Sequence, residues 1–190
     1  MALAGFGRRM AVDIIWLEME VIMAKVLIVV DMQNDFVNGA LGTKEAEHIV
    51  PAVISKVEAA VNSNCKVVFT KDTHYNGYLD TAEGRNLPVE HCIKGSKGWE
   101  IIPGLARYAQ NVIEKNTFGS INLPEEVKDY NEIEIIGLCT DICVISNALL
   151  LKAFFPEKNI YVDALCCAGV TPESHNNALE AMKMCQIKII

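Results

Sequence analysis

Residues 25–36, KVLIVVDMQNDF, decide the fold of this chain. The first six form a continuous apolar run rich in β-branched side chains, which is typical of a strand buried on both faces of a parallel sheet. Polar residues follow at once, beginning with Asp31. Five later runs share this character and are the other candidate strands: residues 66–70, 112–113, 133–136, 159–162 and 187–190.

Helical patterns lie between these runs. Residues 45–61 carry apolar side chains at helical spacing, and we expect Pro51 in the first turn. Other helices are expected over residues 124–130, 141–155 and 172–185, the last capped by Thr171. Alternating strands and helices predict parallel strands joined by right-handed crossovers. We therefore expect an α/β fold, a Rossmann-like three-layer α/β/α sandwich with a mainly parallel six-stranded sheet.

One domain is expected over residues 24–190, preceded by an extension, residues 1–23, outside the core. The apolar run of the extension is interrupted by Asp13, Glu18 and Glu20, so it resembles neither a signal peptide nor a membrane span. A short amphipathic helix that docks on a partner is the alternative interpretation of this segment.

Composition excludes several classes of protein. The 190 residues are 51% hydrophobic and 22% charged, which excludes wholesale disorder. Lys and Arg number 17 against 24 Asp and Glu, a net charge of −7, and no basic run offers a nucleic-acid surface. The seven cysteines cannot all pair and include no CxxC motif, so we expect free thiols and a cytoplasmic location.

Polar residues gather where the predicted strands end. Asp31 follows the first strand, residues 71–74 (KDTH) the second, Lys115 the third and residues 138–143 (LCTDIC) the fourth. In doubly wound α/β folds, ligands bind at the carboxyl ends of the strands, near the point where the strand order reverses. We therefore expect these residues to form one site.

Cys143 is the candidate nucleophile of that site. With Thr140 as the expected N-cap, Cys143 falls in the first turn of a helix, where free amides and the helix dipole stabilise a thiolate. Asp31 can accept the thiol proton, and the Lys115 ammonium can lower the pKa of the thiol. The alternative is that Cys143 is a small core hydrophobe, the role we expect for most of the other cysteines.

Asp72, His74 and His91 are candidate metal ligands. Two imidazoles and a carboxylate suit Zn²⁺, Fe²⁺ or Mn²⁺. Three such residues within twenty positions are common in sequences, so their pattern alone favours ordinary surface histidines. Glu83 is a candidate fourth ligand.

Three motifs resemble those of the isochorismatase-like cysteine hydrolases, and within them the nicotinamidases. These are residues 31–36 (DMQNDF), 112–120 (VIEKNTFGS) and 137–144 (GLCTDICV). The resemblance implies an Asp31–Lys115–Cys143 triad and a cis peptide between Leu138 and Cys139. It also implies that the Cys139 and Cys143 backbone amides form an oxyanion hole. In nicotinamidases, Asp-x-His followed by a later His-Cys-x-x-Gly holds a metal, which supports Asp72, His74 and His91 as ligands here.

The resemblance also implies a function: hydrolysis of nicotinamide to nicotinate and ammonia through a thioester on Cys143. Zinc is the expected metal, with iron or manganese as alternatives. Phe36 is expected to stack on an aromatic amide, although Thr73 stands where nicotinamidases commonly have Trp. Two other functions stay open: a related amidase for ureido, carbamoyl or maleamate-type substrates, and a non-catalytic thiol protein that binds a metabolite. The expected partners are a small amide and further copies of the chain, with neither nucleic acid nor membrane.

Overall fold

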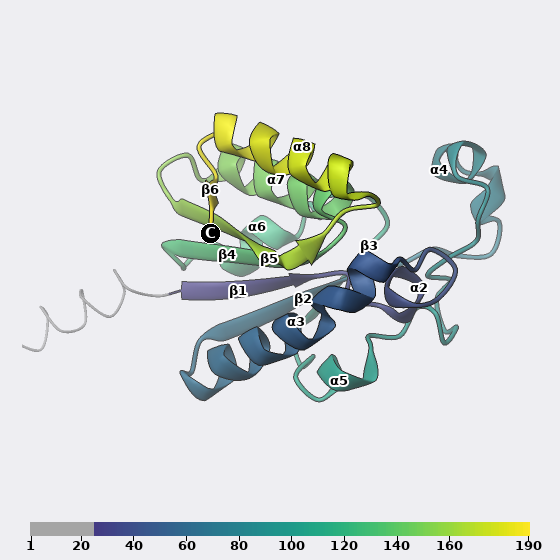
Figure 1. The fold of residues 1–190 in the computed structure, drawn as a ribbon, viewed down its shortest axis with the longest axis horizontal. Helices are drawn as coiled ribbons and strands as arrows, with labels where there is room; N and C mark the ends of the chain where they lie inside the picture. Colours follow the sequence, from purple (N-terminus) through teal and green to yellow (C-terminus); the bar gives the residue numbers. More distant parts are fainter. Residues whose placement is uncertain (1–24) are drawn as a thin grey trace, which may run out of the picture.

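A computed structural model describes residues 25–190 of the chain, and the predicted extension lies outside the described residues. Six parallel strands form one sheet in the order β3-β2-β1-β4-β5-β6 (Figure 1). Their bounds are β1 (Lys25–Val30), β2 (Lys66–Asp72), β3 (Val112–Lys115), β4 (Glu132–Leu138), β5 (Asn159–Ala168) and β6 (Lys188–Ile189). The predicted fold class is therefore confirmed.

The strand order reverses between β1 and β4. The chain builds outward from β1 through β2 to β3, then returns to pair β4 with the other side of β1. This reversal is the topological switch point at which doubly wound sheets bind ligands. The residues that follow β1 and β4 therefore lie side by side at the carboxyl edge of the sheet.

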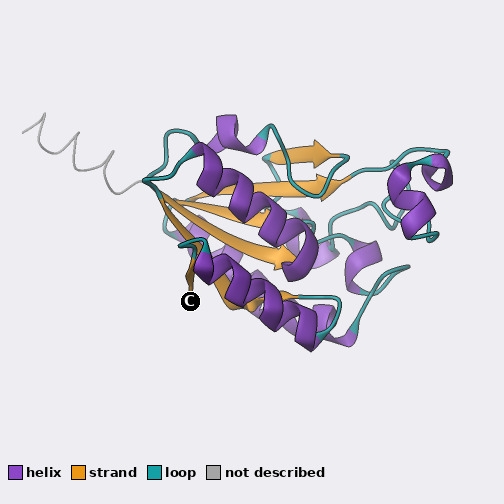
Figure 2. Ribbon diagram, turned by 90° about the horizontal axis from the view of Figure 1, so that it is seen from above, coloured by secondary structure: helices purple, strands orange, loops and turns teal. Residues whose placement is uncertain are grey.

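Helices cover both faces of the sheet, which Figure 2 shows from above. Two apolar cores lie between the helices and the sheet. On one face, α3 (Lys44–Asn62) and α5 (Pro103–Ala106) pack on alternate side chains of the central strands. On the other face lie α6 (Leu123–Val127), α7 (Ile145–Phe154) and α8 (Pro172–Met184). The short helix α2 (Asn34–Val37) follows the end of β1.

An excursion after β2 contains η1 (Tyr78–Asp80) and α4 (Ala82–Asn86). It extends beyond the carboxyl edge of the sheet (Figure 1). None of its residues belongs to either apolar core, within the part of the chain that the structure describes. The sequence pattern did not predict these short elements.

Two local predictions were wrong. Pro51 lies in the interior of α3 rather than in its first turn, because Thr43 caps the helix earlier by accepting a hydrogen bond from the amide of Ala46. The fifth strand is longer than the predicted residues 159–162, because β5 continues to Ala168 after a register shift opposite residues 135–137 of β4, so it contains Cys166 and Cys167. Among residues 25–190, no helix is both long enough and apolar enough to cross a membrane.

Candidate active site

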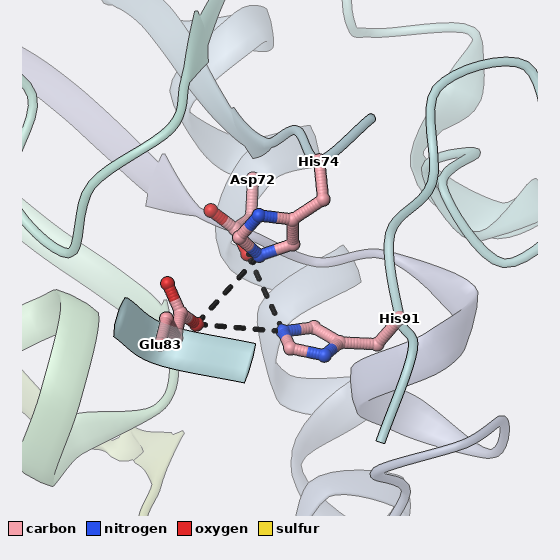
Figure 3. A group of neighbouring side chains, drawn as sticks. All are labelled: Asp72, His74, Glu83 and His91. Carbon is pink, nitrogen blue, oxygen red and sulfur yellow. Dashed lines mark ion pairs between the residues drawn. The ribbon is translucent and has the colours of Figure 1, made fainter. Parts of the chain in front are cut away.

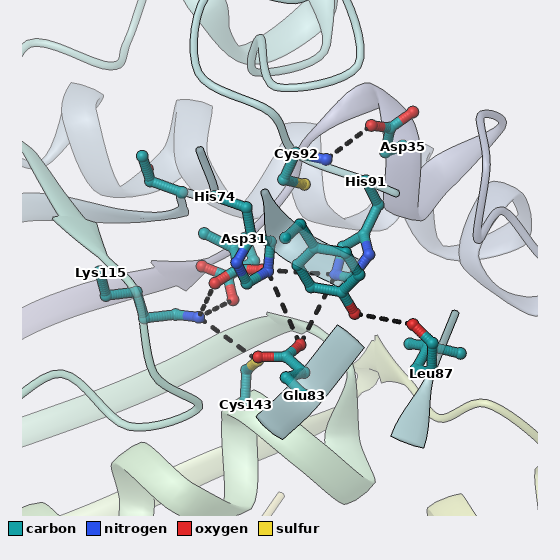
Figure 4. A network of polar contacts seen from close by, with 12 residues as sticks. Asp31, Asp35, His74, Glu83, Leu87, His91, Cys92, Lys115 and Cys143 are labelled. Carbon is teal, nitrogen blue, oxygen red and sulfur yellow. Dashed lines mark hydrogen bonds and ion pairs between the residues drawn. The ribbon is translucent and has the colours of Figure 1, made fainter. Parts of the chain in front are cut away.

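Three strand ends bring the predicted charged residues into one buried cluster (Figure 4). Asp31 follows β1, Asp72 ends β2, and Lys115 ends β3. The Lys115 Nζ lies 2.7 Å from Asp31 Oδ2, 3.2 Å from Asp72 Oδ1 and 3.4 Å from Cys143 Sγ. The side chains of Asp31 and Lys115 are 0% and 1% exposed, so this is a desolvated ion pair beside a thiol.

Asp31 is held in an uncommon backbone conformation. Its φ is +48°, in the left-handed region that residues other than glycine seldom adopt and that is often found at functional sites. Its Oδ1 accepts a hydrogen bond of 2.6 Å from Thr70 Oγ1, which leaves Oδ2 for Lys115. Burial raises the pKa of Asp31, and the Lys115 ammonium opposes that rise. A carboxyl group of this kind can both accept and return a proton.

Cys143 lies in a π-helical turn, η2 (Thr140–Val144), that leads into α7. The predicted cap is wrong: Cys139 is the N-cap, and Thr140 is the first residue of the turn. The Thr140 hydroxyl is instead 2.8 Å from Nδ1 of His175 on α8, although the sequence offered no partner for that histidine. Single π-helical turns of this kind are frequent at functional sites.

The pKa of the Cys143 thiol shifts in the direction opposite to the sequence-based expectation. Burial raises the pKa of its thiol well above the ordinary value, the Asp31 carboxylate raises it further, and Lys115 only partly opposes this. Cys143 is 4% exposed. Burial therefore favours the thiol form of Cys143 over a preformed thiolate.

The residue before the turn also has the expected backbone. The peptide bond between Leu138 and Cys139 is cis. Burial raises the pKa of the Cys139 thiol to about 12. The Lys115 ammonium opposes that rise, but its 3.4 Å contact is with the Cys143 sulfur, so the side chain of Cys143 is the stronger candidate nucleophile.

Four predicted metal ligands converge next to the charged cluster (Figure 3). Asp72 Oδ2 lies 3.0 Å from His74 Nε2 and 3.7 Å from His91 Nε2. Glu83 Oε1, carried by α4, lies 3.6 and 3.8 Å from the same two nitrogens. All four ligand atoms lie within 4.8 Å of one another. Asp72 faces both sites, because its Oδ1 contacts Lys115 and its Oδ2 faces the imidazoles.

The cluster fits a divalent cation. Among the described residues, Nε2 of His74 is buried with no assigned hydrogen-bond partner, and it lies 3.0 Å from Asp72 Oδ2. His91 Nδ1 is 2.8 Å from the carbonyl of Val89, a contact that directs Nε2 toward the cluster. Two imidazole nitrogens and two carboxylate oxygens form a donor set that suits zinc, iron or manganese.

Sequence reasoning missed several residues that hold this site in place. The buried carboxamide of Gln33 accepts a hydrogen bond from the amide of Asp72 and donates to the carbonyls of Asp72 and Trp99. Tyr78, 1% exposed, packs its ring 4.6 Å from that of His74 and 5.1 Å from that of His91. Gln33 lies within the motif at residues 31–36, but nothing in that motif assigned it a role, and no sequence signal pointed to Tyr78.

Phe36 and Thr73 lie at the border of the site. The Phe36 ring is 5.5 Å from that of His91. Thr73 accepts a hydrogen bond of 2.9 Å from Trp99 Nε1 and lines a cavity of about 350 Å³ together with His74, Glu83 and Asn116. Residues of the η1–α4 excursion form much of its lining, and it gives a small ligand room beside the predicted metal ligands His74 and Glu83.

The family model, the sequence relatives and the solved structures that match this chain all point to the same family. The family model for the isochorismatase domain matches residues 25–190. The nicotinamidase/pyrazinamidase of Mycobacterium tuberculosis is 26% identical over 184 residues, which cover 87% of this chain and 98% of that protein. The pyrazinamidase of Pyrococcus horikoshii, solved in complex with zinc, superposes with a TM-score of 0.77 at 29% identity, covering 88% and 98% of the two chains.

A third relative is named for a different amide substrate. The N-carbamoylsarcosine amidase of Thermoplasma acidophilum superposes with a TM-score of 0.74 at 27% identity, covering 88% of this chain and 95% of that one. The family model spans all of the described residues, and both solved structures cover 88% of the chain. The chain therefore belongs to the isochorismatase family.

Proposed function

We propose that this chain, a hydrolase acting on amide bonds, converts nicotinamide to nicotinate and ammonia through a thioester on Cys143. One observation carries the proposal: Asp31 and Lys115, from the ends of β1 and β3, and Cys143, from the turn after β4, lie in a single buried cluster. A proton acceptor, an ammonium and a thiol at these distances are the parts that nucleophilic amide cleavage needs.

Acylation begins with transfer of the Cys143 proton to Asp31. The sulfur attacks the carbonyl carbon, and the backbone amides of Cys139 and Cys143 donate hydrogen bonds to the oxygen that becomes negatively charged. Asp31 then gives its proton to the amide nitrogen, the C–N bond breaks, and ammonia leaves. Lys115 holds Asp31 in place and balances the negative charge shared by the carboxylate and the sulfur.

Hydrolysis of the thioester uses the same groups. Asp31 removes a proton from water, and the resulting hydroxide attacks the acyl carbon. The C–S bond breaks, the product leaves as the acid, and the Cys143 sulfur recovers its proton from Asp31. The cycle returns both residues to their starting forms, so no outside acid or base is consumed.

Asp72, His74, Glu83 and His91 are the residues that would hold a divalent metal, with zinc as our first choice. When bound, the metal supplies a Lewis-acid contact that orients a ring nitrogen of the substrate. The zinc complex of the Pyrococcus horikoshii relative supports this assignment. Phe36, beside His91, is proposed to contact the substrate ring.

Ammonia release from nicotinamide by the purified protein tests the proposal, with the Cys143→Ala and Cys139→Ala variants in parallel. We expect Cys143→Ala to abolish release. Cys139→Ala is the matched control and should retain it, because Cys139 is proposed to act through its backbone amide. Full activity of Cys143→Ala would refute the assignment of the nucleophile.

A second candidate activity is cleavage of a ureido, carbamoyl or maleamate-type amide. Thr73 and Asn116 give the cavity beside the metal ligands a polar wall. A panel of such amides beside nicotinamide, each with ammonia detection, separates the two candidates by kcat/KM. A protein that binds amides without releasing ammonia from any of them would instead be the non-catalytic alternative.

We also propose that the enzyme acts as a homo-oligomer in the reducing cytoplasm. All seven cysteines are free, which supports the second part of this proposal. Size-exclusion chromatography with light scattering tests the first part, and a monomer at micromolar concentration would contradict it.

A further inference from the structure

A fully buried amide side chain lies directly behind the nucleophile. Asn147, the third residue of α7, is 0% exposed. Its Nδ2 donates hydrogen bonds to the carbonyl of Cys143 at 2.8 Å and, at a longer 3.4 Å, to that of Phe118. Its Oδ1 accepts a bond of 2.8 Å from the amide of Ser120. Every polar atom of this side chain therefore bonds to the backbone, and these hydrogen bonds offset the free-energy cost of burying the amide.

The two backbone segments that Asn147 joins carry different parts of the site. One is the turn that contains Cys143. The other is the loop that follows β3, the strand that ends on Lys115. This loop packs closely on α7, since a Cβ added at Gly119 would lie 3.2 Å from the carbonyl oxygen of Ser146. Asn147 therefore links the backbone of Cys143 to the loop that follows Lys115, and the two side chains are 3.4 Å apart between Nζ and Sγ.

We infer that Asn147 is a positioning residue for the reaction: it fixes the backbone of Cys143 and keeps that residue in register with Lys115. This inference rests on the proposed function. The hydrogen bond to the Cys143 carbonyl fixes the backbone of that residue. It thereby orients both the Cys143 sulfur and the Cys143 backbone amide proposed for the oxyanion hole. A displacement of about 1 Å at such groups is enough to lower a rate roughly 100-fold.

The other end of the turn is held independently of Asn147. Thr140 bonds to His175, and the Asp141 carboxylate accepts a hydrogen bond from the amide of Val170 at 3.2 Å. The turn therefore stays attached to α8 when Asn147 is changed. We expect misorientation of Cys143 rather than loss of the fold.

Asn147→Asp is the sharpest test, because it replaces the donating Nδ2 with an acceptor at nearly the same volume. An oxygen would then face the carbonyls of Cys143 and Phe118, and both donated hydrogen bonds would be lost. Asn147→Ser, too short to reach both segments, is the second variant in case the aspartate prevents folding. Asn177→Asp, on the exposed side of α8, is the matched control.

We expect kcat to fall about 10- to 100-fold in both Asn147 variants, with KM within about twofold of the wild type. The affinity for pyridine-3-carbaldehyde, whose adduct with Cys143 mimics the tetrahedral intermediate, should fall by a factor similar to that of kcat. Steady-state ammonia release and inhibition by the aldehyde measure these quantities. A purely structural residue would lower the melting temperature and leave both quantities unchanged.

Values of kcat and aldehyde affinity within twofold of the wild type in a folded Asn147 variant would overturn the inference and leave the proposed function intact. If nicotinamide is not hydrolysed, the same comparison uses whichever amide of the panel is. A wild-type protein that releases ammonia from no amide and forms no aldehyde adduct would overturn the inference and the proposed function together. Failure of the Asn147 inference can therefore be distinguished from failure of the proposed function.

Discussion

Replacing Lys115 with Met tests the electrostatics of the site most severely. Met keeps most of the length of the side chain and removes its charge. The Lys115 ammonium is 2.7 Å from Asp31 and 3.2 Å from Asp72, and none of the three side chains is more than 7% exposed. The substitution therefore leaves two carboxylates in a desolvated space without their shared cation.

The magnitude follows from this burial. Removing one partner of a buried ion pair costs about 3–5 kcal/mol of unfolding free energy, because the remaining charge is left uncompensated. For a chain of this size, each kcal/mol shifts the melting temperature by about 2–4 °C, so we expect a fall of roughly 6–20 °C at neutral pH. Activity should be lost as well.

The loss of unfolding free energy in Lys115→Met should also depend on pH. Burial raises the folded-state pKa of Asp31, and Lys115 opposes this, so the Lys115→Met substitution raises that pKa further. A carboxyl group whose pKa is higher in the folded state binds its proton preferentially there, and its contribution to stability falls as pH rises above the unfolded pKa of about 4. The difference between the variant and the wild type should therefore grow from acid to neutral pH.

Thermal and urea denaturation of both proteins at pH 4.5 and 7.5 measure these effects. Lys94→Met is the matched control, since Lys94 pairs with Glu114 at the surface, where both side chains are well exposed. We expect the control to leave the midpoint nearly unchanged. A Lys115→Met protein that melts with the wild type at pH 7.5, or whose deficit is equal at both pH values, would refute this account of the buried cluster.

Two further predictions concern the backbone and the metal ligands. Gly137 has a φ of +114°, and a Cβ there would lie 2.1 Å from the carbonyl oxygen of Val30, directly before Asp31. We expect Gly137→Ala to lower the free energy of unfolding by at least about 2 kcal/mol, because backbone must move, and a wild-type urea midpoint would contradict this. We expect Glu83→Gln to weaken zinc binding to the chelator-treated protein at least roughly tenfold, because a charged ligand is lost. Calorimetric titration measures it, with Glu90→Gln as the control, and equal dissociation constants would exclude Glu83 as a ligand.

Much of the site could be predicted because a parallel sheet brings strand ends together. Asp31, Asp72 and Lys115 each end or follow a recognisable strand, so the topology alone places them at one edge. Glu83 neither ends nor follows a predicted strand, so the topology did not place it at the site. It reaches the cluster because the η1–α4 excursion folds back over the end of β2, a path that its spacing in the sequence does not specify.

Other features depend on tertiary packing that no local pattern encodes. Asn147 looks like an incidental polar residue in an apolar helix, and its role is visible only once the loop after β3 packs against α7. The position of Cys143 suggested a thiolate, because a helix start favours one. In the folded chain, complete burial outweighs that effect and raises the pKa of the thiol.

The central claim is that Cys143 carries the acyl group. Rapid acid quenching of the wild-type protein during turnover of nicotinamide, followed by peptide mass spectrometry, tests it most directly, with hydroxylamine added in parallel to intercept a thioester. We predict one nicotinoyl group on the peptide that contains Cys143, and formation of the hydroxamate in the trapped reaction. Nicotinate formation with an unmodified Cys143 peptide, no hydroxamate, and an unchanged rate in Cys143→Ala would contradict the account.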